Sequence, residues 1–173
     1  MLTFITELRH RNDALYLFGL ICLVASIAFL LLSATTSVRV YNVSAWYKPF
    51  KFAFSTFLYS WAMAWYCHYL QSFNASLFSW SVIILLGFEI LYIALQAGRG
   101  QLSHYNLSTP LYATLYSLMA IAATAVTVYT AYVGILFFKQ PFPLLPDYYL
   151  WAIRLSILLF VVFSLEGFVM GSR

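Results

Sequence analysis

EILYIALQAGRGQLSHYN, residues 89–106, is the stretch around which the other segments are arranged. It starts as an apolar helix that carries a carboxylate, Glu89, and it ends in a short polar loop. A charged residue inside a bilayer is costly, and it usually has a function or a partner. We therefore interpret this stretch as the centre of the candidate site and ask which other polar residues the helices bring to it.

The composition places the chain in a membrane. Of its 173 residues, 64% are hydrophobic and only 8% are charged. Soluble domains carry about 25% charged residues, so a water-exposed surface could not be covered here. We predict an all-α polytopic membrane protein with a single transmembrane domain over residues 1–173. The net charge of +4 does not come from a run of Lys and Arg, so we expect the lipid bilayer, and no nucleic acid, as a partner.

Five apolar runs are each long enough to cross a bilayer, which takes roughly 20 residues. Because a backbone in lipid must satisfy its own hydrogen bonds, each run is predicted to be a helix. The predicted bundle has five transmembrane helices, at about residues 14–33, 52–70, 77–96, 112–137 and 148–170. The fourth run has small residues at helical spacing, which favours close helix packing, at Ala113, Ser117, Ala120, Thr124 and Ala131.

Five crossings place the two ends of the chain on opposite sides of the membrane. The cations predicted on the C-terminal side are Arg39, Lys48, Lys51, Arg99 and Arg173. Those on the N-terminal side are Arg9, Arg11 and Lys139, with Arg154 one turn inside the last helix. The positive-inside rule then favours a cytoplasmic C-terminus, by a small margin.

Helical periodicity predicts that the polar residues converge on the C-terminal side. In the third run, Glu89, Gln96 and Arg99 share one face. Lys51 opens the second run on that side, and Glu166 lies near the same end of the fifth. We expect one polar funnel that narrows toward Glu89. Its candidate ligand-binding residues are Lys48, Lys51, Glu89, Tyr92, Gln96, Arg99, Ser103, His104, Asn106, Glu166 and Arg173.

Three interpretations of this cluster stay open. Buried pairs of Lys or Arg with Glu can simply hold helices together. A polar cavity can bind a ligand or an ion. A catalytic site is the third, with His104 or Glu89 as the acid–base group, since histidine titrates near neutral pH. Catalytic residues are not assigned by the sequence. It has no CxxC or HxxxH spacing, so no metal site is predicted, and the cofactor is unknown.

Three phrases resemble motifs of a family: WYKPFKFAFS (46–55), QAGRGQLSHYN (96–106) and EGFVMGSR (166–173). They are similar to the patterns KPxKFxxS, QAxRGxxSHxN and EGxxMGxR of an uncharacterised family of bacterial integral membrane proteins. The resemblance implies a multi-pass protein of the bacterial inner membrane. It does not imply a particular activity. Members with these motifs often continue with further membrane segments, so the resemblance would make this chain either a shorter or a truncated member. The motif positions are Lys48, Pro49, Lys51, Ser55, Gln96, Arg99, Gly100, Ser103, His104, Asn106, Glu166, Gly171 and Arg173.

The chain also resembles the translocator-protein (tryptophan-rich sensory) family. The likeness lies in the five predicted helices, the aromatic content and the phrase Trp46-Tyr47-Lys48-Pro49. The proline-rich and tryptophan-rich run that follows in that family is absent here.

From these observations we expect a membrane protein that binds a small anionic or amphipathic ligand, or an ion, in a sensor-like or transport-like role. Lys51, Arg99 and Arg173 would attract an anionic group, while Glu89 and Glu166 balance the buried charge. Two alternatives remain. One is an accessory subunit of a larger membrane complex or a homo-oligomer, and the other is an intramembrane enzyme.

Overall fold

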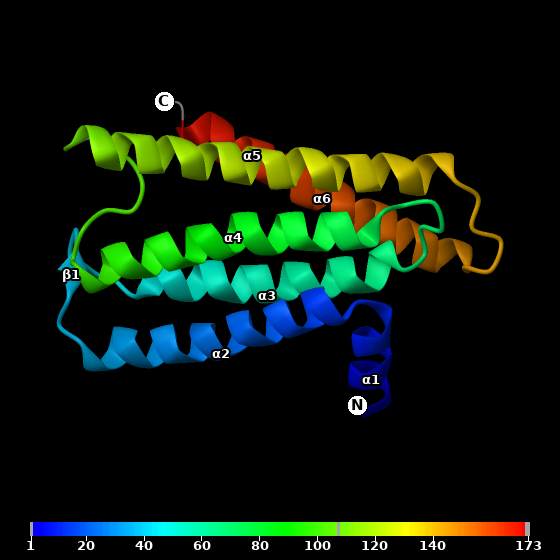
Figure 1. Cartoon of the computed structure of the whole chain (residues 1–173), viewed down its shortest axis with the longest axis horizontal. Coiled ribbons are helices and arrows are strands. Elements are labelled where there is room, and N and C mark those ends of the chain that lie inside the picture. The colour runs from blue at the N-terminus through cyan, green and yellow to red at the C-terminus, as the bar shows by residue number, and fades with distance from the viewer. Residues whose placement is uncertain (1, 107, 172–173) are drawn as a thin grey trace.

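The computed structural model describes residues 2–106 and 108–171, and side chains up to Glu166. The described residues form six helices and one short hairpin (Figure 1). The elements are α1 (Leu2–Arg11), α2 (Asp13–Thr35), β1 (Arg39–Val40), β2 (Val43–Ser44), α3 (Tyr47–Cys67), α4 (Ala75–Gly98), α5 (Pro110–Lys139) and α6 (Asp147–Gly171). The prediction of an all-helical chain is confirmed apart from this hairpin, in which β1 and β2 pair antiparallel.

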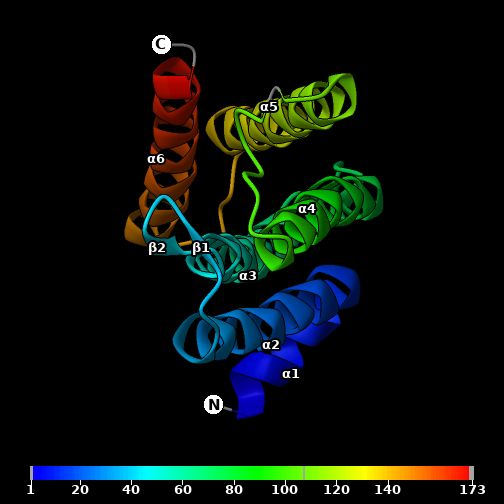
Figure 2. The ribbon, with the colours of Figure 1, turned by 90° about the vertical axis from the view of Figure 1, so that its left-hand side faces the viewer.

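The long helices run side by side along the longest axis of the molecule (Figure 1). Seen along that axis, α3 lies between α2 and α4, and α5 lies beyond α4 and beside α6 (Figure 2). The short helix α1 lies across one end of the bundle. The hairpin and the loop between α4 and α5 lie at the other end, near the C-terminus. We call these the α1 end and the hairpin end.

Four helices are long and apolar enough to cross a membrane: α2, α4, α5 and residues 147–166 of α6. This is the pattern of a multi-pass membrane protein. The second predicted span, at about residues 52–70, corresponds to α3, which is a helix of 21 residues but is less apolar than the other four. Three of its polar residues, Thr56, Tyr59 and Ser60, are buried against neighbouring helices and do not face lipid. The Tyr59 hydroxyl lies 2.6 Å from Oγ1 of Thr130, which joins α3 to α5.

Side-chain caps fix where three of the helices begin. Asn12, Asn74 and Thr109 each accept a hydrogen bond from a backbone N–H in the first turn of α2, α4 and α5. Such caps satisfy donors that have no partner within the helix. Asn12 also donates to Oγ of Ser79 at 2.8 Å, so the starts of α2 and α4 are held together.

The two ends of the bundle are packed differently. The large core, with Phe78 and Phe137 fully buried, fills the α1 end and the middle. A second, smaller core near the hairpin end is formed by Tyr92, Ile93 and Met119. The hairpin end has few core residues, so side chains fill it less completely than they fill the α1 end.

The α1 helix was not predicted from the sequence. It is held against the bundle by Arg11, whose guanidinium lies 3.8 Å from the centre of the Trp65 ring and 4.9 Å from that of Tyr69. Arg11 also donates to the carboxylate of Glu7 at 2.8 Å. Cation–π contacts and a neighbouring carboxylate thus hold this cation at the α1 end.

The helices α2 and α3 pack closely at Gly19, and a substitution there tests this packing. A Cβ at this position would lie 2.4 Å from Cδ1 of Trp61, whose Nε1 donates to the carbonyl of Tyr16 at 3.2 Å. Gly19→Ala must displace that ring, and we expect it to lower the free energy of unfolding by about 1–3 kcal/mol. Thermal or denaturant unfolding in detergent measures the change.

Gly87→Ala is the matched control, because its new Cβ would meet its nearest neighbour, Phe18, at 3.8 Å. Its stability should be unchanged or raised by about 0.5–1 kcal/mol, since alanine favours a helix over glycine. Equal stability of the two variants would contradict the packing described for Gly19.

Candidate functional site

One cavity near the hairpin end has a volume of about 580 Å³ and lies between α3, α4, α5, α6 and the α4–α5 loop. We call it the Glu89 cavity. Its lining residues are Phe52, Glu89, His104, Tyr105, Tyr116, Met119, Ala120, Ala123, Thr124, Thr127, Val128, Ser164 and Leu165. Exposed Ala123, Thr124 and Val128 on α5 leave it open on one side, where a membrane helix would face lipid.

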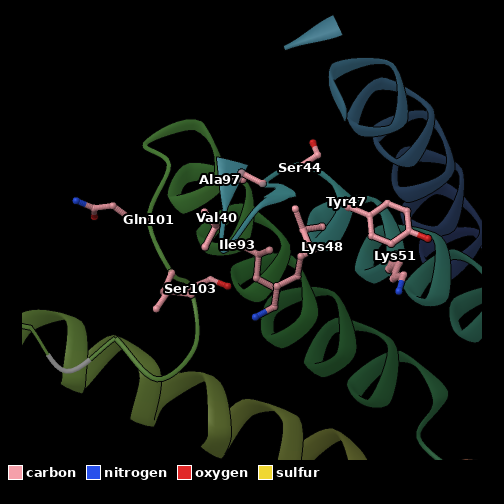
Figure 3. Close-up of a pocket in the computed structure, with 12 residues that line it drawn as sticks. Val40, Ser44, Tyr47, Lys48, Lys51, Ile93, Ala97, Gln101 and Ser103 are labelled. Carbon is pink, nitrogen blue, oxygen red and sulfur yellow. The ribbon is translucent and has the colours of Figure 1, made fainter. Parts of the chain in front are cut away.

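The second cavity is smaller, about 260 Å³, and lies between the hairpin, the start of α3 and the end of α4. We call it the basic cavity. It is lined by Val40, Val43, Ser44, Ala45, Tyr47, Lys48, Lys51, Ile93, Ala97, Gln101, Leu102 and Ser103. In Figure 3, Lys48 and Ser103 point toward one another, whereas Gln101 points away. Lys51 has Nζ 4.5 Å from the centre of the Tyr47 ring and is exposed.

Glu89 is the most unusual residue of the site. Its side chain is only 2% exposed, although it is an acidic residue on an apolar helix. Its Oε1 atom is buried and has no hydrogen-bond partner among the described residues. A buried polar atom without a partner costs free energy whether the carboxyl is charged or neutral. The arrangement therefore leaves a strong hydrogen-bonding group without a partner in the wall of the cavity, where a bound molecule could satisfy it.

His104 lines the Glu89 cavity. Its Nδ1 is 3.2 Å from Oγ of Ser103, and the centre of its ring lies 6.1 Å from that of Tyr116, which lines the same cavity. Burial, and secondarily the charge of Lys48, lower the pKa of His104 to about 4. The imidazole is therefore neutral near pH 7, and it offers the cavity no positive charge.

The loop that carries His104 has a defined conformation. Gly100 has φ of +64°, in the left-handed region that glycine adopts without a steric cost. Asn106 accepts a hydrogen bond from Oγ of Ser108 at 2.6 Å and donates to the carbonyl of Leu102 at 3.3 Å. Asn106 was predicted to bind a ligand, but its side chain forms hydrogen bonds within the loop and stabilises the loop conformation.

Tyr92 and Gln96 form a pair inside the protein. Gln96 donates from Nε2 to the Tyr92 hydroxyl at 2.9 Å, and both residues are buried. They are absent from the described walls of both cavities. Since Tyr92 belongs to the small core at the hairpin end, the pair supports the floor of the site.

The structure replaces the single predicted funnel with two cavities. Glu89 and His104 line one, while Lys48, Lys51 and Ser103 line the other. Arg99 and Glu166 are exposed, and neither is among the described lining residues. Arg173 lies outside the described residues. Lys51 and Glu166 therefore do not converge with Glu89 in one funnel, because Lys51 lines the basic cavity and Glu166 is exposed outside the described walls of both cavities.

The apolar walls of the Glu89 cavity were not predicted. Ala120 and Thr124 were predicted to lie in a helix contact, but they line the cavity. Tyr116 and Met119 line it as well, and an aromatic or a methionine in an apolar helix gives no signal that separates a cavity wall from a core. Glu89 with His104 is the part of the wall that the sequence indicated.

Comparisons with protein-family models, with curated proteins and with solved structures find no match for this chain. Within residues 2–106 and 108–171, no three His, Cys, Asp or Glu side chains are grouped so that they could hold a metal ion.

The low pKa of His104 makes a pH dependence testable. An unfolded histidine binds a proton below about pH 6.5, whereas folded His104 does so only near pH 4. The unfolded state therefore binds more protons in this window, and the contribution of His104 to stability falls as the pH drops from 6.5 to 4. His104→Gln, which does not titrate, should lose less thermal stability over the same range.

Melting temperatures of the two chains measured from pH 4 to pH 8 in one detergent give the comparison. Above pH 6.5 the two curves should run parallel, because His104 is then neutral in both states. An identical loss of melting temperature in acid for both chains would contradict the buried, neutral imidazole.

Proposed function

We propose that this chain is an integral membrane protein that binds a small amphipathic molecule in the Glu89 cavity. The observation that carries the proposal is the buried carboxyl of Glu89, which faces a cavity and has an oxygen without a partner in the described structure. A ligand that fills the cavity and bonds to this oxygen would remove the cost of leaving it unsatisfied.

The size and lining of the cavity support this proposal. Small-molecule sites commonly have volumes of about 300–1,000 Å³, mostly apolar walls and a few polar groups that fix the orientation of the ligand. The Glu89 cavity has about 580 Å³ and is walled mainly by aliphatic and aromatic side chains. It offers Glu89 and His104 at one end, so a molecule with an apolar body and one polar group matches it.

The structural interpretation of the cluster is less favourable. A pair of opposite charges could hold helices together. The ion pairs within the described residues are Arg9 with Asp13 and Arg11 with Glu7, both near the α1 end. At the hairpin end, Glu89 has no such partner in the described part of the chain, so a role in joining helices would lack its second group.

The open side of the cavity supports access from the bilayer. Thr124 and Val128 are exposed on α5, one of the four helices that are apolar enough to cross a membrane. A molecule dissolved in the lipid would enter sideways, without crossing the polar loop. We also propose that the protein lies in a bacterial inner membrane, as the motif resemblance implies. From the polar cavity we propose a sensor-like or transport-like role, with the cavity on the C-terminal side.

Ala123→Phe tests the proposal by filling the cavity. The native membrane molecules that co-purify with the chain are released and identified by mass spectrometry. At least one that co-purifies with the wild type should decrease about tenfold or more in Ala123→Phe, a loss of about 1.4 kcal/mol of binding. The reason is that the benzyl group would occupy the space between α5 and Glu89.

Ala152→Phe is the matched control, because Ala152 is exposed on α6 and outside the described walls of the cavities. It should retain the wild-type set of bound molecules. An identical set for both variants and the wild type would overturn the proposal.

A further inference from the structure

We infer that the ligand of the Glu89 cavity carries a protonated amine on an apolar body, and that the carboxylate of Glu89 receives this amine. The inference rests on the proposed function and adds the chemical class of the ligand. It follows from the charges, the hydrogen-bond donors and acceptors, and the shape of the described cavity walls.

The charge of the cavity favours a cation. Glu89 is its acidic residue, and its described walls contain no Lys or Arg. A buried carboxylate without a counter-charge is strongly unfavourable, and an ammonium group compensates it with a short, charge-assisted hydrogen bond. An anionic ligand would instead place two negative charges together in an apolar site, which is costly.

Three described cations near the hairpin end lie outside the walls of the Glu89 cavity. Lys51 lies over the ring of Tyr47 on the outside of α3, and Arg99 is exposed at the end of α4. Lys48 lines the basic cavity. None of these side chains lies in the described walls around Glu89, so a positively charged ligand would supply a compensating charge that these cations do not.

Two threonine hydroxyls add hydrogen-bond acceptors to the wall of the cavity. The hydroxyl of Thr124 donates to the carbonyl of Ala120 at 2.7 Å, and the hydroxyl of Thr127 donates to that of Ala123 at 2.8 Å. With their protons engaged in the helix, these two oxygens can only accept a further bond. An ammonium group, which has three donors and no acceptor, suits a wall made of a carboxylate and hydroxyl oxygens.

The remaining walls suit the rest of such a molecule. The rings of Tyr105 and Tyr116 lie 5.1 Å apart at the loop end of the cavity, where aromatic faces attract a cation. Met119, Val128 and Leu165 give an apolar surface that continues to the open side. The geometry therefore places the amine at Glu89 and directs the apolar body along α5 toward the bilayer.

Three probes with the same twelve-carbon chain test the inference, because they differ only in the head group: dodecylamine, dodecanol and dodecanoate. Each is titrated into the full chain in phosphatidylcholine nanodiscs, with binding followed by thermal shift and calorimetry. Dodecylamine should bind to the wild type about tenfold or more tightly than dodecanol, and dodecanoate should bind least. Glu89→Gln should lose this preference for the amine and retain the weak binding of the alcohol.

Glu166→Gln is the matched control, since Glu166 is an exposed carboxylate on α6 outside the described cavity walls. It should bind dodecylamine as the wild type does, which separates the cavity from general attraction of amines to an acidic surface. If Glu89→Gln does not fold, Ala123→Phe decides instead, because it should exclude dodecylamine without a change of charge.

Equal binding of dodecylamine to the wild type and to Glu89→Gln would overturn the inference. Tighter binding of dodecanoate than of dodecylamine, or no binding of the amine, would do the same. Any of these results could occur together with the loss of a native membrane molecule from Ala123→Phe. The cavity would then remain a ligand site, and only the proposal of an amine would be rejected.

Discussion

The carboxyl of Glu89 lies inside the protein with one oxygen that no group in the described structure satisfies, and the packing of the whole bundle makes this arrangement stable. At the α1 end, Phe78 and Phe137 are fully buried and the helices are in close contact. This end holds α4 and α5 in place. At the hairpin end the same helices enclose a cavity, so a polar group on α4 can remain buried there without a protein partner.

Such an arrangement is costly, which is why it points to a function. Leaving a buried polar atom unsatisfied costs about 1–3 kcal/mol, a large part of the net stability of a small protein. Natural proteins usually accept local costs of this kind at functional sites. His104, Thr124 and Thr127 do not reduce the cost, because none of them donates a hydrogen bond to Oε1 of Glu89 in the described structure.

The helices could be predicted from the sequence more fully than the site. Apolar runs gave the positions of α2 to α6, because burial in lipid demands length and hydrophobicity. The start of α3 was predicted at residue 52 but lies at Tyr47, since Lys48 and Lys51 interrupt the apolar run yet fit a helix end. The helix α1 was missed because charged Glu7, Arg9 and Arg11 break its apolar pattern.

The limits of the site prediction have one physical cause. Helical periodicity shows which residues share a face, but it does not show toward which neighbour that face turns. Glu89 is buried, whereas Lys51 and Glu166 are exposed and lie outside the described walls of its cavity, although all three are charged residues near the same end. His104 reaches the cavity through the bend of the loop at Gly100 and Tyr105, both at positive φ, which apolar periodicity cannot indicate.

An experimental density map of the full chain in lipid nanodiscs tests the role of Glu89 most directly. It should show non-protein density in the cavity within hydrogen-bonding distance of the carboxyl of Glu89, about 2.7–3.2 Å for a nitrogen donor. A map in which α5 closes onto α4 and leaves no cavity, or in which a protein side chain pairs with Glu89, would contradict it.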